Sequence, residues 1–480
     1  MENTNIDTLI NMVNGYDNNS ENKIREAYKY AEYLHEGQKR QSGEPYIIHP
    51  LNVAYILSEM HADKDTICAA LLHDTLEDTN TTYEEIREKF GNEVAKLVNG
   101  VTKISKMNYN TKKEQNLANT RKIITSITQD VRIIIIKLAD RLHNMRTIQY
   151  KTIEKQLENA NETLQVFVPL ANLIGVRRIK DELEDISLKC IDLSSYQRIS
   201  SSVQKINEES NNEIQEMLYK INEILAAENI PTEIKIRTKN IYGIYKKMKL
   251  GYKLNNIHDL ISFKILVEEI NQCYLAIFPI HQAYKPVNEL FKDYIARPKP
   301  NYYQSLHTTV FAKDGRLIQM QFRTKEMEEI GSFGLARYWQ IKGENARITM
   351  QETLKRKYQF YSSLEELDKS CITNEEFVNQ VTKELLCEKV YVFTASGRVM
   401  ELPEGATIID FAYYVKQELG DTMVGATVNN EIVPLNYKLK TGDRIKIQTD
   451  YSSYGPRPAE WEQIAFTKHA KEKIKEWYAK

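Results

Sequence analysis

Hydrophobic periodicity changes twice along this 480-residue chain, and these changes limit its possible folds more than any other feature. Up to about residue 190, apolar residues recur every three or four positions, as at Ile24, Ala27, Ala31 and Leu34, which predicts successive amphipathic helices. Beyond residue 230, short β-rich runs alternate with helical stretches, and near Lys389 a hairpin pattern begins. The sequence therefore predicts a multidomain α+β protein that begins with an all-α part.

The segments after residue 195 can be placed more closely. A polar stretch rich in Ser, Asn and Glu, residues 197–229, is expected to form an exposed helix that links two domains. The α+β part is expected to contain strands at 233–236, 260–267, 308–311 and 317–322, followed by helix over 336–367. In the last part we expect a hairpin of 390–393 and 399–402, a helix at 408–419, strands at 424–428 and 444–448, and a basic helix from 468.

Composition excludes several classes of protein. There are 65 Lys and Arg against 66 Asp and Glu, so the chain is neither a basic nucleic-acid coat nor a polyacidic disordered chain, and any phosphate-binding surface must be local. Only 18 glycines and 12 prolines interrupt the chain, which favours helix.

Nothing in the sequence indicates export or a membrane. The first 20 residues show no secretory signal, and the most apolar run, 131–139, contains Arg132 and Lys137 and is far shorter than the roughly 20 residues of a membrane span. The five cysteines have no CxxC spacing and are expected to be reduced thiols. We therefore expect a cytoplasmic protein.

Polar residues cluster at the end of an apolar run in residues 67–78. His73 and Glu77 are four residues apart, as are Asp74 and Asp78, so each pair is expected to share one helix face. Two carboxylates at this spacing repel each other, and burial beside the apolar run adds a desolvation cost for each charge. A divalent cation would offset both effects.

Two further metal-ligand candidates lie in similar settings, where an apolar segment meets polar residues: His49 in residues 44–50 and Asp140 in residues 137–144. The alternative is that His73 and Asp74 cap a helix and that the other side chains are solvated surface.

Three separated segments carry a family resemblance: "RQSGEPYIIHP" (40–50), "HDTLEDT" (73–79) and "KLADRLHNMRT" (137–147). Together they resemble the hydrolase domain of the long RelA/SpoT homologues, bacterial enzymes that make and destroy the alarmone (p)ppGpp. The ligand set resembles that of the HD phosphohydrolase superfamily.

The resemblance implies an all-α HD-type (p)ppGpp hydrolase domain over residues 1–195, with linker helices at 196–230. It implies a Mn²⁺ ion that polarises the attacking water, protein groups that handle protons and orient this water, and residues that hold the nucleotide. By this resemblance, the metal ligands are His49, His73, Asp74 and Asp140. The residues that handle protons and orient the water are Glu77 and Asp78, and the residues that hold the nucleotide are Arg40 and Asn144.

A second constellation is basic. Residues 235–253 hold seven basic residues in nineteen and no acid, which indicates an anion site, with a solvated basic helix as the alternative. Residues 292–309 interleave basic groups with Tyr302, Tyr303 and His307, which suits base stacking combined with phosphate contacts. The alternative there is a packed strand with a polar edge.

Both segments resemble the synthetase domain of the same family, an α+β nucleotidyltransferase-like fold expected here over residues 231–370. That domain moves pyrophosphate from ATP to the 3′-OH of GDP or GTP. By resemblance, Mg²⁺ is expected on Asp259 if the site is active, and guanine is expected to stack on Tyr303. The other matching residues are Arg237, Lys239 and Lys247 for the ATP phosphates, Lys299, Asn301, Gln304 and His307 on the acceptor side, and Gln321 and Arg323 in the closing strand.

The departures from the synthetase pattern matter more than the matches. Gln319 stands where the family has a glutamate that is expected to share Mg²⁺ and to help activate the attacking hydroxyl. A neutral amide neither carries the charge nor accepts the proton. Five further positions around the site also depart: Asn240, Leu290, Tyr302, Ser332 and Tyr338. We interpret the synthetase as impaired, with a retuned activity as the alternative.

Residues 388–450 resemble the TGS domain of the family, a small β-grasp fold that senses uncharged tRNA on the ribosome. Lys416 stands where the family usually has a histidine for the tRNA 3′ end. Residues 451–480 resemble the start of the helical region that follows.

Three functions remain open at this point. The first is Mn²⁺-dependent hydrolysis of (p)ppGpp to GDP or GTP and pyrophosphate, in stringent-response control, with an impaired synthetase domain. The second is a bifunctional enzyme that also uses ATP to pyrophosphorylate GDP or GTP. The third is a non-catalytic regulator that senses guanine nucleotides and binds tRNA or the ribosome.

Overall fold

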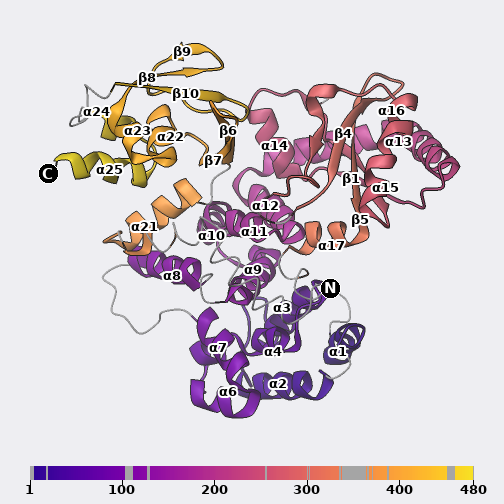
Figure 1. Ribbon diagram of the computed structural model, residues 1–480. Helices are drawn as coiled ribbons and strands as arrows, with labels where there is room; N and C mark the ends of the chain where they lie inside the picture. The colour runs from indigo at the N-terminus through magenta and orange to yellow at the C-terminus, as the bar shows by residue number, and fades with distance from the viewer. Residues whose placement is uncertain are drawn as a thin grey trace. The chain divides into compact units, whose positions relative to one another are not determined.

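The structure is a computed structural model and describes residues 5–17, 20–102, 112–126, 130–254, 257–299, 301, 303–334, 337, 364, 367–369, 371–385, 389–450 and 460–478. Figure 1 shows its helices and strands. The chain divides into two units, Met1–Tyr109 with Lys122–Lys357, and Asn110–Arg121 with Tyr358–Lys480, and each is described by itself.

The N-terminal part is helical, as the periodicity predicts. Its helices are α1 (Ile6–Asn14), α2 (Glu21–Leu34), α3 (Ile48–Glu59), α4 (Lys64–Leu72), α5 (Thr75–Asp78), α6 (Tyr83–Phe90), α7 (Asn92–Val101), α9 (Val131–Arg146), α10 (Ile153–Glu162), α11 (Val168–Leu173) and α12 (Arg177–Ile191). The intervening helix α8 (Lys112–Ser126) belongs to the second unit up to Arg121. Short turns η1 (Ile148–Tyr150) and η2 (Thr163–Phe167) flank α10.

The apolar runs of the sequence form the centre of this helical part. Asp63 caps α4 by accepting a hydrogen bond from the Thr66 amide, and Asp130 caps α9 through the Arg132 amide. Every residue of α4 from Thr66 to Leu72 is buried, and so is the first half of α9. The chain turns directly after Leu72, so the polar residues that follow lie at the end of a buried helix.

The polar stretch at 197–229 is helical, but its expected exposure is wrong. It forms α13 (Leu193–Ala227), and an apolar stripe along that helix belongs to the buried core of the α+β part, with Ile199, Met217, Ile221 and Leu225 among its members. Ser, Asn and Glu on the outer face hid this stripe, because it repeats only every three to four residues. The helix therefore covers a domain core rather than spanning solvent.

The α+β part is built on a five-stranded sheet in the order β1-β2-β5-β4-β3. The strands are β1 (Glu233–Thr238), β2 (Ile261–Val267), β3 (Lys292–Asp293), β4 (Leu306–Phe311) and β5 (Leu317–Thr324). β2 and β5 pair in parallel, with Ser262 opposite Gln319, and the other pairs are antiparallel. The helices are α14 (Ile241–Lys249), α15 (Ile270–Leu275), α16 (Ile277–Ala283) and α17 (Lys325–Phe333), with a short turn, η4 (Asn288–Leu290).

The second unit contains the other five-stranded sheet, in the order β7-β6-β10-β8-β9. The strands are β6 (Lys389–Thr394), β7 (Val399–Pro403), β8 (Met423–Val428), β9 (Glu431–Val433) and β10 (Arg444–Thr449). The predicted hairpin is confirmed, because β6 and β7 pair antiparallel. The helical elements are α21 (Asn374–Gln380), η5 (Val381–Leu385), α22 (Ile408–Val415), α23 (Gln417–Thr422), α24 (Glu460–Ile464) and α25 (Lys468–Tyr478).

Some expectations concern residues outside the described set. They are Tyr302, Tyr338, and most of the helix expected over 336–367. Within the described ranges, none of the helices combines the length and apolar character that a membrane span requires.

Candidate metal centre and a second polar cluster

Four predicted ligand side chains meet inside the helical part, and we call them the metal-centre cluster: His49, His73, Asp74 and Asp140. His49 lies in the first turn of α3, His73 and Asp74 occupy the turn after α4, and Asp140 lies in α9. The Nε2 atom of His49 is 3.3 Å from Asp140 Oδ1 and 3.6 Å from Asp74 Oδ2. His73 Nε2 is 3.2 Å from Asp74 Oδ2 and 3.9 Å from Asp140 Oδ1. Two ring nitrogens and two carboxylates thus face one small volume.

The state of His73 fits a cation in that volume. Its side chain is fully buried, and its Nδ1 atom donates a hydrogen bond to the Ala70 carbonyl at 2.7 Å. In a neutral imidazole the other nitrogen, Nε2, then carries a lone pair. This Nε2 is buried and has no hydrogen-bond partner among the described residues. His49, His73 and Asp140 each offer an atom within 4.8 Å of the others, so nitrogen and oxygen donors are in place for a divalent metal.

The two carboxylates are ionised. Burial alone would raise the pKa of Asp74, but the positive charge that His73 carries when protonated holds this pKa well below its ordinary value. A proton shared by this pair therefore lies on the imidazole, where a bound cation would replace it. Burial likewise opposes ionisation of Asp140, and the positive charge of Lys137, whose Nζ is 3.1 Å from Asp140 Oδ2, brings that pKa below its ordinary value. Both groups are therefore available as anionic ligands.

The two predicted catalytic carboxylates lie in α5, beside the ligands. The Tyr46 hydroxyl is 2.6 Å from Asp74 Oδ2 and 3.1 Å from Asp78 Oδ2, so it lies between a ligand and a catalytic candidate. Burial, followed by the charge of Asp74, raises the pKa of Tyr46, so the phenol keeps the proton that it donates. Glu77 is half-buried and Asp78 is exposed. The turn at His73 and Asp74 breaks the single helix expected over these residues.

The predicted substrate-binding pair is in direct contact. Arg40 Nη2 donates to Asn144 Oδ1 at 2.8 Å, and Asn144 Nδ2 donates to Asp140 Oδ1 at 2.6 Å. Arg40 Nη1 also lies 3.3 Å from His143 Nδ1. A guanidinium therefore stands one side chain away from the metal-centre cluster.

Most of the predicted phosphate-binding residues lie in a second cluster, where acids already neutralise them. Lys239 Nζ is 2.6 Å from Asp259 Oδ2, and Lys247 Nζ is 2.8 Å from Asp259 Oδ1; we call these three residues the lysine-aspartate cluster. Burial opposes ionisation of Asp259, but Lys239 and Lys247 bring its pKa well below the ordinary value.

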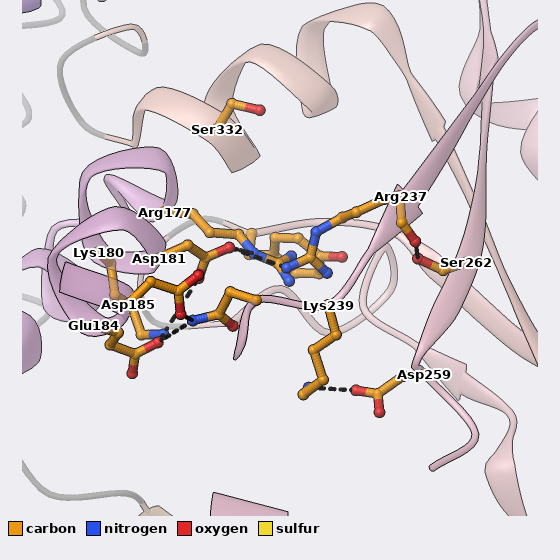
Figure 2. A network of polar contacts seen from close by, with 12 residues as sticks. Arg177, Lys180, Asp181, Glu184, Asp185, Arg237, Lys239, Asp259, Ser262 and Ser332 are labelled. Carbon is orange, nitrogen blue, oxygen red and sulfur yellow. Dashed lines mark hydrogen bonds and ion pairs between the residues drawn. The ribbon is translucent and has the colours of Figure 1, made fainter. Parts of the chain in front are cut away.

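Acidic side chains from α12 face the same region, as Figure 2 shows. Asp181 Oδ2 is 3.0 Å from Arg237 Nη2. Asp185 accepts backbone hydrogen bonds from Tyr242 at 2.8 Å and from Ile241 at 3.3 Å, and so caps α14 from a neighbouring helix. Asn240, one of the departing positions, donates to Asp185 and thereby supports this contact.

Gln319 and the residues beyond it on β5 form a chain of hydrogen bonds. Gln319 Oε1 accepts from Gln321 Nε2 at 2.6 Å, and Arg323 donates to Gln321 and, at 2.7 Å, to the Tyr303 hydroxyl. Tyr303 Oη also lies 2.8 Å from His307 Nε2. The amide at position 319 is thus hydrogen-bonded to a neighbour on its own strand and supplies no carboxylate.

The predicted acceptor-side residues make separate contacts with different neighbours. Tyr303 is only 8% exposed, so its ring is not open to a base in this arrangement. Lys299 Nζ lies over the Tyr294 ring at 4.7 Å, and Gln304 Nε2 is 3.4 Å from the Ile295 carbonyl. Asn301 instead donates to the Asn172 carbonyl of the helical part at 3.1 Å. Two other positions that differ from the family's synthetase pattern are also described: Leu290 lies in η4, and Ser332 donates to Glu328 at 3.3 Å.

Several residues of these clusters were not predicted from the sequence. His143 lies three residues after Asp140 in the same helix, so helical spacing from a proposed ligand would have found it. Lys137 precedes Asp140 at the same spacing. Tyr46 lies in the turn before α3, so helical spacing from His49 gave no signal for it. The acids of α12 had no comparable signal, because their partners are more than 50 residues away in the chain.

Three family models match the chain in order: an HD domain at residues 27–177, a region found in RelA/SpoT proteins at 236–346, and a TGS domain at 390–449. They fall on the helical part, the first sheet and the second sheet.

Curated relatives match over nearly the whole chain. A guanosine-3′,5′-bis(diphosphate) 3′-pyrophosphohydrolase of Aquifex aeolicus is 42% identical over 471 residues, covering 95% of this chain and 65% of its own length. The bifunctional (p)ppGpp synthase/hydrolase SpoT of Escherichia coli K12 is 40% identical, covering 95% and 64%. A GTP pyrophosphokinase of Myxococcus xanthus is 41% identical, covering 94% and 60%. The chain thus spans 60 to 65% of the length of these relatives.

A solved structure described as a metazoan ortholog of SpoT that hydrolyzes ppGpp is 28% identical, covers 36% of this chain and 96% of its own, and has a TM-score of 0.28. A TM-score this low supports no structural comparison.

Proposed function

This chain belongs to the family of long RelA/SpoT homologues, and on that premise we propose that it is a cytoplasmic, Mn²⁺-dependent hydrolase that removes the 3′-pyrophosphate of (p)ppGpp. One observation carries the proposal. The buried Nε2 atom of His73, which has no hydrogen-bond partner among the described residues, faces a second imidazole and two carboxylates, with Asp74 Oδ2 at 3.2 Å. Such a set of donors is costly to bury without a cation.

In this proposal the residues of the chain have the following roles. His49, His73, Asp74 and Asp140 would hold Mn²⁺, which when bound lowers the pKa of a water molecule and stabilises negative charge on phosphorus oxygens. Arg40, beside this cluster, can pair with a phosphate oxygen, and Asn144 fixes its guanidinium at 2.8 Å.

The acids of α5 would handle the proton. Asp78 is exposed and held by Tyr46, so it can accept a proton from the attacking water, and Glu77 in the same helix can orient this water. Hydrolysis breaks the bond between the ribose 3′ oxygen and phosphorus, and it yields GDP or GTP and pyrophosphate.

We further propose that the synthetase domain binds guanine nucleotides and ATP poorly or unproductively and transfers no pyrophosphate. In support, Asp259 is paired with two lysines, Arg237 is paired with Asp181, and Gln319 supplies an amide where Mg²⁺ chemistry needs a carboxylate. The TGS domain is proposed to contact tRNA or the ribosome, and Lys416 is exposed on it.

Two parallel assays on the full chain test the proposal. One supplies ppGpp with Mn²⁺, and the other supplies ATP, GDP or GTP, and Mg²⁺. We expect GDP and pyrophosphate in the first and no alarmone in the second. New alarmone that disappears in Asp259→Ala would instead establish a bifunctional enzyme, and tight guanine-nucleotide binding without turnover in either assay would establish a regulator.

A further inference from the structure

Three nitrogen atoms meet behind the metal-centre cluster, on the side away from the ligand atoms. His143 lies in α9, one turn after Asp140, and is 5% exposed. Its Nδ1 atom is 2.8 Å from His49 Nδ1 and 3.3 Å from Arg40 Nη1. These contacts determine where the protons of both imidazoles lie.

The guanidinium settles the first proton. Arginine only donates hydrogen bonds, so a hydrogen on His143 Nδ1 would face a hydrogen of Arg40 across 3.3 Å. The contact is favourable only if this Nδ1 atom carries its lone pair, which Arg40 and the nearer His49 Nδ1 then share. A neutral imidazole has one donor and one acceptor, so the proton of His143 is on its Nε2 atom. Since His143 Nδ1 carries no hydrogen, its short contact with His49 is a hydrogen bond only if His49 donates from Nδ1. The lone pair of His49 is then on Nε2, the atom that faces Asp74 and Asp140.

The two ligand histidines therefore reach the same protonation pattern by different means. His73 donates from Nδ1 to a main-chain carbonyl, that of Ala70, which no substitution removes. His49 donates to a side chain, which a substitution can remove. Hydrogen bonds of this kind hold the ring orientation of a metal-binding histidine and favour the nitrogen that binds.

We propose that His143 is a positioning residue that keeps the Nε2 lone pair of His49 aimed into the metal-centre cluster. The inference rests on the proposed function, because it assumes that this cluster binds a metal. It also gives Arg40 a second role. Arg40 contacts His143, which holds His49, and Asn144, which donates to Asp140, so one substrate-side cation orders groups behind two ligands.

Two substitutions at one position test the proposal. His143→Asn keeps an acceptor, because the asparagine Oδ1 occupies the place of the imidazole Nδ1, whereas His143→Leu keeps the bulk and removes the acceptor. The Mn²⁺ dissociation constant of the full chain is measured by the electron paramagnetic resonance signal of free Mn²⁺, without substrate. We expect weakening of about 10- to 100-fold in His143→Leu and of less than about threefold in His143→Asn.

A matched control and a second measurement keep the test decisive. His281 lies in α16, and its Nε2 atom is 2.9 Å from Thr308 Oγ1. The control variant His281→Leu is expected to leave Mn²⁺ affinity unchanged. If His143→Leu does not fold, long-range ¹H–¹⁵N spectra of ¹⁵N-histidine-labelled, metal-free wild type decide, with His49→Gln and His143→Asn for assignment. We expect protons on His49 Nδ1 and His143 Nε2.

Three results would overturn the proposal. They are wild-type Mn²⁺ affinity in His143→Leu, an equal loss of Mn²⁺ affinity in both His143 variants, and a proton on Nε2 rather than Nδ1 of His49. The proposed function fails separately, if the wild type binds Mn²⁺ but does not cleave ppGpp.

Discussion

In the metal-centre cluster the buried Nε2 atom of His73 has no hydrogen-bond partner within the described structure, whereas in the lysine-aspartate cluster each oxygen of Asp259 is bonded to a lysine. In the first arrangement the carboxylates also have partners, Tyr46 for Asp74 and Lys137 and Asn144 for Asp140, but the Nε2 atom of His73 is left without a hydrogen bond to any described residue. The second satisfies its charges internally. The first site thus keeps a buried histidine nitrogen available for a cation, although Asp140 is also paired with Lys137. At the second site a cation or a triphosphate must displace both ion pairs of Asp259. The comparison shows that a cluster can contain the residue types of a binding site while their charges are already paired with one another.

The largest expected effect breaks the prepared site. His73→Ala removes one proposed metal ligand, and because metal catalysis supplies several kcal/mol, we expect ppGpp hydrolysis to fall about 10³-fold or more. Steady-state release of pyrophosphate measures the loss, and His281→Ala serves as the control at an unrelated histidine. Hydrolysis by His73→Ala within tenfold of wild type would show that the metal-centre cluster is not the active site.

The next largest effect concerns the synthetase domain, which contains the lysine-aspartate cluster. Gln319→Glu restores a carboxylate on β5 opposite Ser262, a residue of β2 that follows Asp259 by three positions in the chain. General-base assistance is worth about 10²- to 10⁴-fold, so we expect alarmone formation from ATP and GDP, which we propose that the wild type lacks, to become measurable. The product should disappear in the double variant Gln319→Glu, Asp259→Ala. If Gln319→Glu forms no alarmone, the ion pairs of the cluster, rather than the missing carboxylate, keep this site silent.

A smaller effect concerns the hydroxyl between the two acids of the prepared site. Tyr46→Phe removes the donor to Asp74 and Asp78 but keeps the ring that stacks on His35, with centroids 4.6 Å apart. Removing such a partner of a metal ligand typically lowers activity about 10- to 100-fold. We expect this loss in kcat with little change in thermal stability. A variant with the wild-type kcat would show that Asp78 needs no orientation by Tyr46.

The smallest expected effect tests the acid of α12 that caps α14. Asp185→Leu leaves the Ile241 and Tyr242 amides without their acceptor, which costs about 1–2 kcal/mol, whereas Asp185→Asn keeps an acceptor and should cost less than about 1 kcal/mol. Hydrogen exchange at these two amides measures the change, and ppGpp hydrolysis should be nearly unaffected. Equal protection in both variants would mean that the cap does not stabilise α14.

Sequence patterns predicted the local features of this molecule and missed those that depend on distant neighbours. The strands at 260–267 and 390–393 were predictable, because apolar β-branched residues cluster there, but β3 and β9, with two and three residues, are too short to leave a pattern. The helix over 197–229 was predictable, but its buried stripe was not, because burial depends on the sheet that α13 packs against.

The candidate site divides in the same way. His49, His73, Asp74 and Asp140 stood out because each follows or lies within an apolar segment, and the structure brings them together. The acceptor role of His143 was not visible, because it depends on Arg40, which is 103 residues away in the chain. The pairing of Asp181 with Arg237 was equally hidden. Residue type and spacing therefore pointed to the proposed ligands but not to the groups that orient or neutralise them.

The central contrast is tested most directly by locating the metal. Crystals of the full chain soaked in Mn²⁺ would be measured at the manganese absorption edge. We predict one anomalous peak in contact with His49 Nε2, His73 Nε2, Asp74 and Asp140, and none between Lys239, Lys247 and Asp259. An empty metal-centre cluster, or a peak only at Asp259, would contradict the account.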